Sequence, residues 1–217
     1  MIIFFAPLGL YIFNADFYNK LYIENNVYES LKSDSVQKMT SDIFEFFQYR
    51  GDLRGDVRFA DPLKSSTAFF TDSEISHMED VRDLLKNIFI LFLVSLAILA
   101  ALFIILVSTD KKKNLRKIGF LCLWSSSIVL FIFILFYILS TNFSYLFNSF
   151  HAVFFPQGNF MFPEGSLLIT LSPFGFFYQF FIRLIISSSA AALVLLIAGI
   201  ICISVQRKYE RIFKIGK

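Results

Sequence analysis

Three long stretches of the chain consist almost entirely of apolar residues. They run from Leu84 to Ser108, from Ile118 to Ser140 and from Leu184 to Val205. A helix needs about 20 apolar residues to cross a hydrocarbon layer roughly 30 Å thick, so each stretch predicts a membrane-spanning helix. A fourth apolar stretch, residues 2–14, is shorter and contains Pro7 and Gly9. It lacks the charged start and cleavage site of a signal peptide, and we interpret it as a shortened first span.

The segments between these stretches carry apolar residues at helical spacing. Within residues 15–83, one apolar stripe comprises Val36, Met39, Thr40, Ile43, Phe44, Phe46 and Phe47. It predicts an amphipathic helix that lies on the membrane surface or packs against the protein itself. Within residues 141–183, an aromatic stretch that ends at Pro156 is too short to span and predicts an interfacial helix. The chain is thus predicted to be one domain, residues 1–217. Its fold class is an all-α membrane protein with four transmembrane helices and extracytoplasmic amphipathic or interfacial helices.

The sequence before the second span contains a helix N-terminal capping motif. Thr71-Asp72-Ser73-Glu74 is a capping box, in which the threonine and glutamate side chains satisfy the first amides of a helix. No helix breaker follows until Ser108. His77, Asp80 and Leu84 therefore share one face, at positions i, i+3 and i+7 of a helix that continues into the span.

The basic residues predict how the chain is oriented. Five Lys and Arg residues lie in 110–117 and five more in 206–217, and short loops rich in these residues stay cytoplasmic. Residues 15–83 and 141–183 are then extracytoplasmic, and both termini are cytoplasmic. Residues 15–86 carry nine Lys and Arg against 14 Asp and Glu. The net charge of +3 is therefore an average over segments on the two opposite sides of the membrane. It gives no indication of a nucleic-acid partner.

Composition narrows the chemistry further. The chain is 56% hydrophobic with 30 phenylalanines, more apolar material than a water-soluble core of this length hides. Cys122 and Cys202 fall inside predicted spans, where we interpret them as packing residues. There is no C-x-x-C, no H-E-x-x-H and no glycine-rich phosphate loop, and two histidines alone cannot complete a zinc site. We therefore predict neither a metal nor another cofactor.

Two histidine motifs carry a family resemblance. Residues 73–84, SEISHMEDVRDL, resemble the E-x-x-H-M-x-D-V signature of the bacterial lipoprotein intramolecular transacylase (Lit) family. Residues 150–155, FHAVFF, resemble that family's F-H-x-x-F-F pattern, and the aromatic-x-F and L-x-x-P-x-x-F-F patterns are similar to residues 160–162 and 167–177. Phe160 stands where the family pattern has a tryptophan. The resemblance covers most of residues 15–185.

The resemblance implies an acyltransferase of the bacterial cell membrane. Members of this family move the sn-2 acyl chain of a diacylglyceryl-cysteine lipoprotein onto the α-amine of the same cysteine, which leaves a lyso-form lipoprotein. The implied partners are a diacylated lipoprotein and membrane lipid, and the implied site is extracytoplasmic. An amide is more stable than an ester, so the transfer needs no nucleotide or metal to drive it.

The two histidines suit this reaction. An α-ammonium with a pKa of about 7.7–8 must lose a proton before it attacks an ester, and an imidazole with a pKa near 6.5 accepts that proton at neutral pH. We predict that His151 is the general base and that His77 polarises the carbonyl or stabilises the oxyanion. The roles can be exchanged, or one imidazole can carry the acyl group. Asp80 is predicted to fix the tautomer of His77 or to pair with Arg82.

Aromatic residues near the histidines predict an acyl-chain groove. Its candidate lining is Met78, Phe147, Phe150, Phe154 and Phe155. Lipid-facing or core packing is the alternative interpretation of these phenylalanines. The alternative function is a non-enzymatic scaffold or a small transporter whose histidines bind lipid headgroups. A transporter is expected to carry charged residues within its spans, and residues 88–108, 118–140 and 184–205 contain none.

Overall fold

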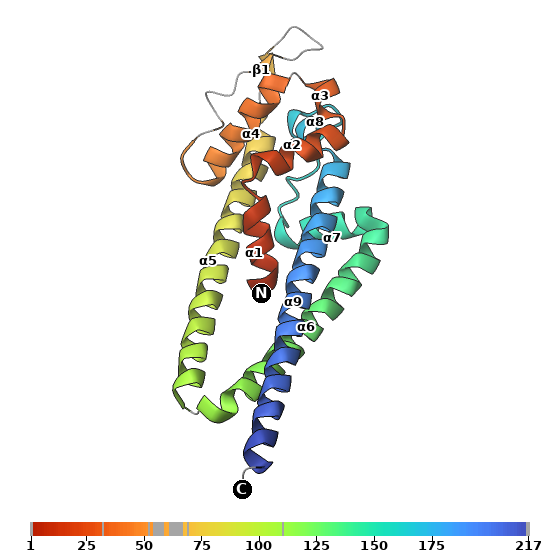
Figure 1. Cartoon of the computed structure of the whole chain (residues 1–217). Helices are drawn as coiled ribbons and strands as arrows, with labels where there is room; N and C mark the ends of the chain where they lie inside the picture. Colours follow the sequence, from red (N-terminus) through yellow and green to blue (C-terminus); the bar gives the residue numbers. More distant parts are fainter. Residues whose placement is uncertain are drawn as a thin grey trace. The chain divides into compact units, whose positions relative to one another are not determined.

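The computed structural model describes residues 2–31, 33–51, 53, 59–60, 67–68, 70–109 and 111–215. Most of them are helical (Figure 1). The helices are α1 (Ile2–Tyr11), α2 (Ala15–Glu24), α3 (Val27–Ser30), α4 (Ser33–Phe47), α5 (Asp72–Thr109), α6 (Lys111–Leu139), the 3-10 turn η1 (Ser140–Asn142), α7 (Phe143–Phe154), α8 (Leu167–Leu171) and α9 (Phe174–Ile215). Two short strands, β1 (Phe59–Ala60) and β2 (Thr67–Ala68), pair antiparallel with Phe59 opposite Ala68.

The chain divides into two compact units. The apolar unit comprises Met1–Pro7, Leu91–Thr141 and Arg183–Lys217, and the polar unit comprises Leu8–Ile90 and Asn142–Ile182. Two long helices, α5 and α9, each contribute to both units. Both predicted histidine motifs fall in the polar unit, so the candidate site can be described within that unit alone.

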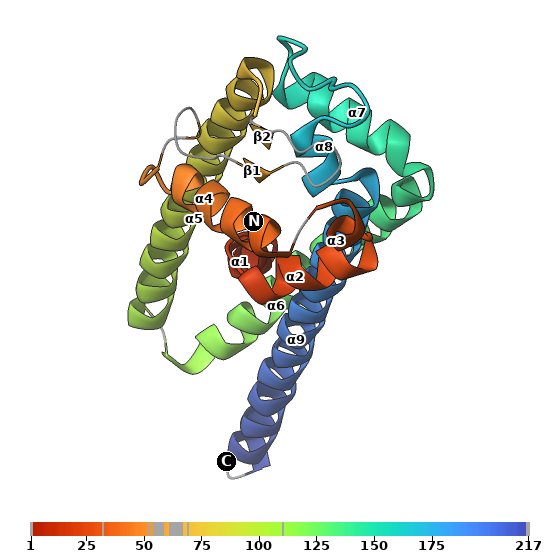
Figure 2. The ribbon, with the colours of Figure 1, turned by 90° about the horizontal axis from the view of Figure 1, so that it is seen from above.

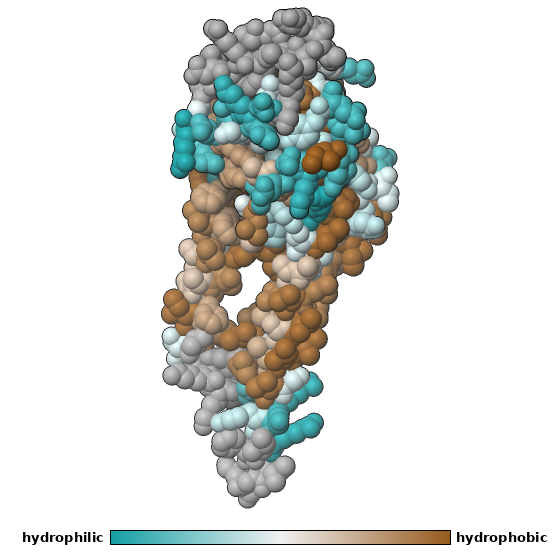
Figure 3. Space-filling view, turned by 45° about the horizontal axis from the view of Figure 1, so that its top comes forward, coloured by the Kyte–Doolittle hydropathy of each residue, from teal (hydrophilic) through white to brown (hydrophobic). Residues whose placement is uncertain are grey.

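Three helical regions are long and apolar enough to cross a membrane. They are Asp72–Leu106, Leu115–Phe154 and Phe174–Arg211. These regions contain the apolar runs predicted from the sequence, except for the last two residues of the first run, and the side chains of the runs are largely exposed and hydrophobic (Figure 3). His77 precedes the run that begins at Leu84, and His151 follows the run that ends at Ser140. Both histidines therefore lie beyond the ends of the apolar runs, within the helical regions that contain them.

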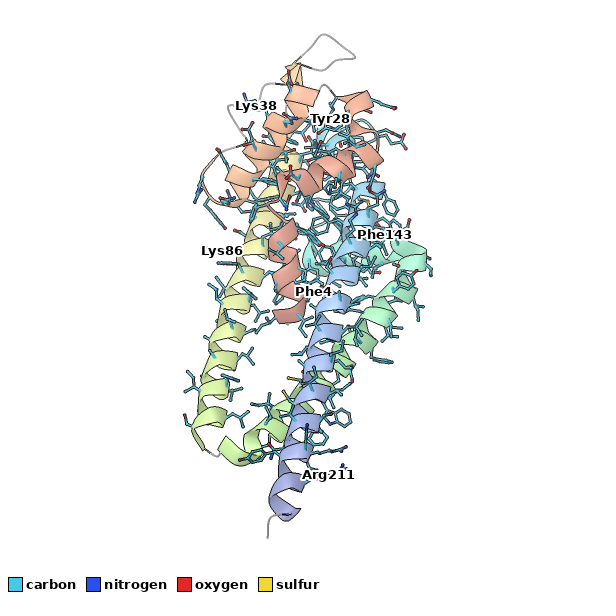
Figure 4. The ribbon with its side chains drawn as sticks, viewed as in Figure 1. Phe4, Tyr28, Lys38, Lys86, Phe143 and Arg211 are labelled. Carbon is cyan, nitrogen blue, oxygen red and sulfur yellow. The ribbon has the colours of Figure 1, made fainter. Side chains whose placement is uncertain are left out.

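The expected fourth span is represented by α1, which has only 10 residues. At about 1.5 Å per residue, this helix is roughly 15 Å long and cannot cross the hydrocarbon layer by itself. Within the apolar unit, its Phe4 ring lies 6.2 Å from Phe133 of α6, and its Phe5 ring lies 6.4 Å from Phe92 of α5 (Figure 4). The start of α1 therefore packs with the long apolar helices although it is too short to span.

Helices α6 and α9 approach each other closely in the apolar unit. A Cβ atom at Gly119 would stand 2.8 Å from the carbonyl oxygen of Gly199, and one at Gly199 would stand 2.9 Å from that of Gly119. Such paired small residues let two membrane helices bring their backbones together. Cys122 lies at this crossing and carries a free thiol, in keeping with its interpretation as a packing residue.

The core of the polar unit is built around α4. Its apolar stripe is turned inward, with Val36 and Met39 fully buried and Phe46 nearly so. These residues belong to one buried cluster with Leu21 of α2 and residues of α5, α8 and α9. Thr40 donates a hydrogen bond to the Val36 carbonyl at 2.7 Å. The amphipathic helix predicted from the sequence thus exists, and its apolar face covers the protein's own core.

Helix α7 has one packed and one open side. Phe143, labelled in Figure 4, contacts Phe174, Tyr178 and Phe181 of α9, with ring centroids 5.2–5.6 Å apart. Val153, on another face of the helix, is 72% exposed. The position of this helix at a membrane interface stays a prediction.

Candidate active site

The first turn of α5 fixes the position of His77. The Thr71 backbone N–H and hydroxyl both donate to one carboxylate oxygen of Glu74, at 2.7 and 2.9 Å, and the Glu74 N–H donates to the Thr71 hydroxyl at 3.2 Å. This is the predicted capping box, and it starts the helix at Asp72. His77 lies one turn after Glu74, so the cap and the imidazole belong to one rigid segment.

The second carboxylate oxygen of Glu74 makes a long-range bond. It accepts a hydrogen bond from the backbone N–H of Leu168, in the first turn of α8, at 2.8 Å. Glu74 is only 1% exposed. Its negative charge lies at the starts of two helices, where the amides carry partial positive charge. Glu74 therefore joins α8 to the segment that bears His77.

We expect Glu74→Gln to lower the thermal unfolding temperature of the protein in detergent. The amide side chain keeps the shape, but its NH2 group would face either the Thr71 or the Leu168 N–H, so one buried donor loses its partner at a cost of about 1–3 kcal/mol. Asp72→Asn is the matched control, since Asp72 is an exposed carboxylate in the same helical turn. Equal unfolding temperatures for Glu74→Gln and Asp72→Asn would show that the link to Leu168 contributes nothing.

His151 lies in the last turn of α7, and its tautomer follows from one hydrogen bond. Its Nδ1 is 2.8 Å from the carbonyl oxygen of Phe147, one turn earlier. A carbonyl only accepts, so Nδ1 must carry the proton and donate it. In the neutral ring the lone pair then belongs to Nε2. His151 is thus held in the form in which Nε2 can accept a proton.

The structure brings the two histidines together. Their ring centroids are 5.8 Å apart, with 26° between the ring planes. Figure 2 shows the start of α5 beside the end of α7, the two segments that carry them. His77 is 7% exposed and His151 8%. Two residues 74 positions apart in the sequence therefore share one largely buried cluster.

Aromatic rings surround the pair. Phe155 is 2% exposed and lies 4.8 Å from His77 and 5.5 Å from His151, measured between ring centroids. Phe162 lies 5.6 Å from His77, and Phe160 lies 5.0 Å from His151. These two residues were not among the predicted site residues, although both stand in the aromatic-x-F pattern that follows the second histidine motif.

Burial sets the protonation of both imidazoles. The pKa of His77 is lowered to about 4, mainly by removal from water and further by the neighbouring His151, whereas Asn159 and Asp80 oppose the shift. Burial likewise lowers the pKa of His151, against the opposing effect of the Phe147 carbonyl. Both rings are therefore neutral at pH 7, and a neutral imidazole is the form that accepts a proton.

Asp80 is linked to the loop after α7. Its Oδ2 accepts hydrogen bonds from the side-chain amides of Gln157 and Asn159, each at 2.6 Å. Asn159 also donates to the Ser76 hydroxyl at 3.3 Å. Asp80 thus reaches His77 indirectly, through Asn159. Neither Gln157 nor Asn159 was expected from the sequence, since no periodicity or motif marks them.

Arg82 points to another part of the polar unit. Its guanidinium lies 4.3 Å from the centroid of the Phe46 ring and 4.5 Å from that of Tyr49, so it packs over α4 and the turn that follows. Five residues along a helix amount to about 140° of rotation, which separates its face from that of His77. The contacts of Arg82 therefore join α5 to α4, and those of Asp80 join α5 to the loop after α7.

The predicted groove residues occupy different environments. The rings of Phe147 and Phe150 lie 4.1 and 5.5 Å from His151, and Phe154 lies 4.7 Å from Phe150. Phe150 and Phe154 are exposed, whereas Phe155 is buried beside both histidines. Met78 is also buried, but in the core cluster of the polar unit. The rings of Phe147, Phe150 and Phe155 thus lie around His151, and Phe154 extends this group to the exposed side of α7. Met78 belongs to the core instead.

Two further features bear on ligands. Within the described ranges, no group of three or more His, Cys, Asp or Glu side chains is placed to hold a metal ion. A cavity of about 150 Å³ lies among α2, α3 and α4 and is lined by neither histidine. Its lining is Ala15, Asn19, Tyr22, Tyr28, Gln37, Thr40, Ser41 and Phe44.

Comparison with known families identifies the chain. The family model described as lipoprotein intramolecular transacylase Lit matches residues 1–177. The chain belongs to this family. No curated protein and no solved structure matches it. The Lit match includes both histidine motifs and confirms the resemblance found in the sequence. The protein is therefore a member of a family of acyltransferases that act on lipoproteins, and its long apolar helices are those expected of a membrane protein.

Proposed function

We propose that this Lit protein moves the sn-2 acyl chain of a diacylglyceryl-cysteine lipoprotein onto the α-amine of the same cysteine. The observation that carries the proposal is the pair of buried imidazoles, 5.8 Å apart in an aromatic cluster, within the residues that the family model matches. Neutral imidazoles beside an apolar surface suit a reaction that moves protons between an amine and an ester of a lipid.

The proposed step conserves every atom of the lipoprotein. The amine nitrogen forms a bond to the ester carbonyl carbon, and the bond between that carbon and the sn-2 glycerol oxygen breaks. The products are an amide at the cysteine nitrogen and a free hydroxyl on the glycerol. His151 accepts the amine proton at Nε2 and delivers it to the departing oxygen, which its tautomer allows.

His77 is proposed to act on the carbonyl side of the same reaction. Its ring faces that of His151, and the separation of 5.8 Å leaves both within reach of one ester group. There it polarises the carbonyl or stabilises the negative charge on the tetrahedral intermediate. Phe147, Phe150, Phe154 and Phe155 are proposed to hold the acyl chain, since they extend from His151 to the exposed side of α7.

We further propose that the site faces the extracytoplasmic side of the bacterial membrane. The five basic residues of 110–117 and the five of 206–217 would hold these segments in the cytoplasm. In this arrangement α1 enters the membrane as a shortened fourth span and α7 lies at the interface. In a variant lacking Cys122 and Cys202, a cysteine at Ser144 is then expected to react with an impermeant thiol reagent in intact cells, and one at Arg207 is not. The reverse pattern would refute this orientation.

Lipopeptides from a host that makes diacylated lipoproteins test the proposed reaction. Expression of this protein is expected to yield N-terminal lipopeptides whose fragment ions contain an N-acyl cysteine and a monoacyl glyceryl group. Intact mass alone does not suffice, because an internal transfer conserves it. If only free-amine diacylglyceryl peptides are found while the protein is present in the membrane, the proposal is wrong, and a non-enzymatic scaffold becomes the better explanation.

The dependence of the rate on pH follows from the lowered histidine pKa values. Below the amine pKa of about 7.7–8, each pH unit removes about nine-tenths of the reactive free amine. Protonation of His151 would lower the rate further only below the pKa of this residue in the folded protein, which lies below 6.5. Protonation of His77 would lower the rate only near pH 4. We expect a slope of one in the logarithm of the initial rate down to pH 6.5 and a steeper fall only at lower pH. Steepening at or above pH 6.5 would contradict the buried, neutral site.

A further inference from the structure

Two buried polar atoms at the site have no hydrogen-bonding partner. They are Nδ1 of His77 and Oδ1 of Asn159, which lies in the loop after α7, and both are inaccessible to water. Buried polar atoms are seldom left in this state, because each costs the free energy of its lost hydration. The two side chains are nevertheless close enough for Asn159 to act on the ring of His77 as a hydrogen-bonding group.

The orientation of the Asn159 amide decides which atom faces His77. Its Nδ2 donates to Oδ2 of Asp80 at 2.6 Å and to the Ser76 hydroxyl at 3.3 Å. An ionised carboxylate only accepts, so the NH2 group must be on the Asp80 side, and a flipped amide would place oxygen against oxygen. Gln157 bonds the same carboxylate oxygen and holds it in place. The atom of Asn159 left for His77 is its carbonyl oxygen.

We propose that Asn159, oriented by Asp80, is the positioning residue that holds the proton of His77 on Nδ1. An amide oxygen only accepts, so it favours the ring form that donates from Nδ1 and leaves the lone pair on Nε2. Asn159 then does for His77 what the Phe147 carbonyl does for His151. Each imidazole presents an unprotonated Nε2.

This arrangement of the two tautomers adds detail to the proposed transacylation, and its role in catalysis rests on that proposed function. A substrate ammonium loses two protons when it becomes an amide: one is needed by the glycerol oxygen, and one leaves to the solvent. Two bare Nε2 atoms provide one acceptor for each proton. Once His77 is protonated, its Nε2–H can also donate to the developing oxyanion while Nδ1–H stays on Asn159. The predicted effect of Asp80 on the tautomer of His77 then operates through Asn159.

Nitrogen-15 NMR can read both tautomers directly, because the chain contains only two histidines. The full-length protein, labelled with 15N-histidine in detergent micelles, is expected to give two neutral rings with pyrrole-like Nδ1 and pyridine-like Nε2 signals, assigned with His77→Gln. In Asn159→Leu the signals of His77 should move toward the other tautomer, while those of His151 stay in place and report an intact fold. Asn148→Leu, on the exposed surface of α7, is the matched control and should change neither ring.

Two results would overturn the inference. One is a wild-type His77 protonated on Nε2, and the other is a His77 spectrum that Asn159→Leu leaves unchanged. If Asn159→Leu disturbs His151 as well, Gln157→Ala replaces it, since this variant loosens Asp80 and is expected to shift only His77 in part. In the lipopeptide assay Asn159→Leu should lower kcat by about 10²-fold with little change in KM. A wild-type protein without transacylase activity would refute the proposed function, whereas the tautomer is decided by NMR alone.

Discussion

Replacing His151 with alanine is expected to lower the rate of N-acyl cysteine formation by about 10²–10⁴-fold. The variant removes the imidazole whose Nδ1 donates to the Phe147 carbonyl and whose Nε2 is thereby free to take the amine proton. The loss should appear in kcat, because the proton transfer occurs after the lipoprotein is bound. Initial rates with purified protein and a diacylated lipopeptide measure it.

The control for His151 is a neighbouring substitution that leaves the cluster intact. Asn148→Ala lies on the exposed surface of the same helix and should retain the wild-type rate. The amounts of both variants in the membrane must match that of the wild type. A His151→Ala protein that keeps more than about a tenth of the wild-type kcat would exclude a general base at this position.

Replacing His77 with glutamine is expected to cause a loss of similar size, for a different reason. Glutamine can still fill part of the space next to Phe155 and can donate or accept a hydrogen bond, but it cannot take up a proton and become a charged donor during the reaction. The expected fall in kcat is about 10²–10³-fold, the range found when one stabilising donor of an oxyanion is removed.

The double variant of both histidines distinguishes a cooperating pair from two independent residues. Groups that act as a unit are not additive, so the double variant should be little slower than the slower single variant. Losses that multiply would instead show that the two imidazoles act in separate events. The comparison uses the same lipopeptide and the same initial-rate measurement as the single variants.

Local sequence patterns predicted the elements that carry the site. The capping box at Thr71–Glu74 specifies the start of α5, because its hydrogen bonds involve residues only three apart. The long apolar runs and the stripe of α4 are likewise periodic features that one segment determines alone. The family motifs added that His77 and His151 belong together, which periodicity could not supply for residues on separate helices.

The partners of the site residues were not predictable in this way. Glu74 bonds Leu168 and Asp80 bonds Asn159, across 94 and 79 positions, and nothing in a single sequence specifies such pairs. Arg82 was expected near Asp80, yet residues two apart on a helix do not share a face, and its ring contacts are with α4. Met78 was grouped with the groove through its neighbour His77, but the next residue along a helix turns about 100° away and enters the core.

The length of α1 shows a similar limit for the membrane helices. Apolarity alone identified residues 2–14, and the helix formed is Ile2–Tyr11. Its contacts through Phe4 and Phe5 explain why this short segment is apolar although it does not reach across a bilayer. The prediction of four spans therefore holds for three helices of sufficient length, and the fourth rests on the orientation proposed above.

A diacylglyceryl lipopeptide with a deuterated sn-2 acyl chain tests the central claim most directly. It is mixed with an equal amount of a lipopeptide of different peptide mass and unlabelled acyl chains, and both are incubated with purified protein in lipid vesicles. The account predicts fragment ions in which the deuterated chain is on the α-nitrogen of its own peptide only, and a rate of formation lower by at least about 10²-fold with the double histidine variant. Label on the other peptide, label that stays on glycerol, or a double variant as active as the wild type would contradict it.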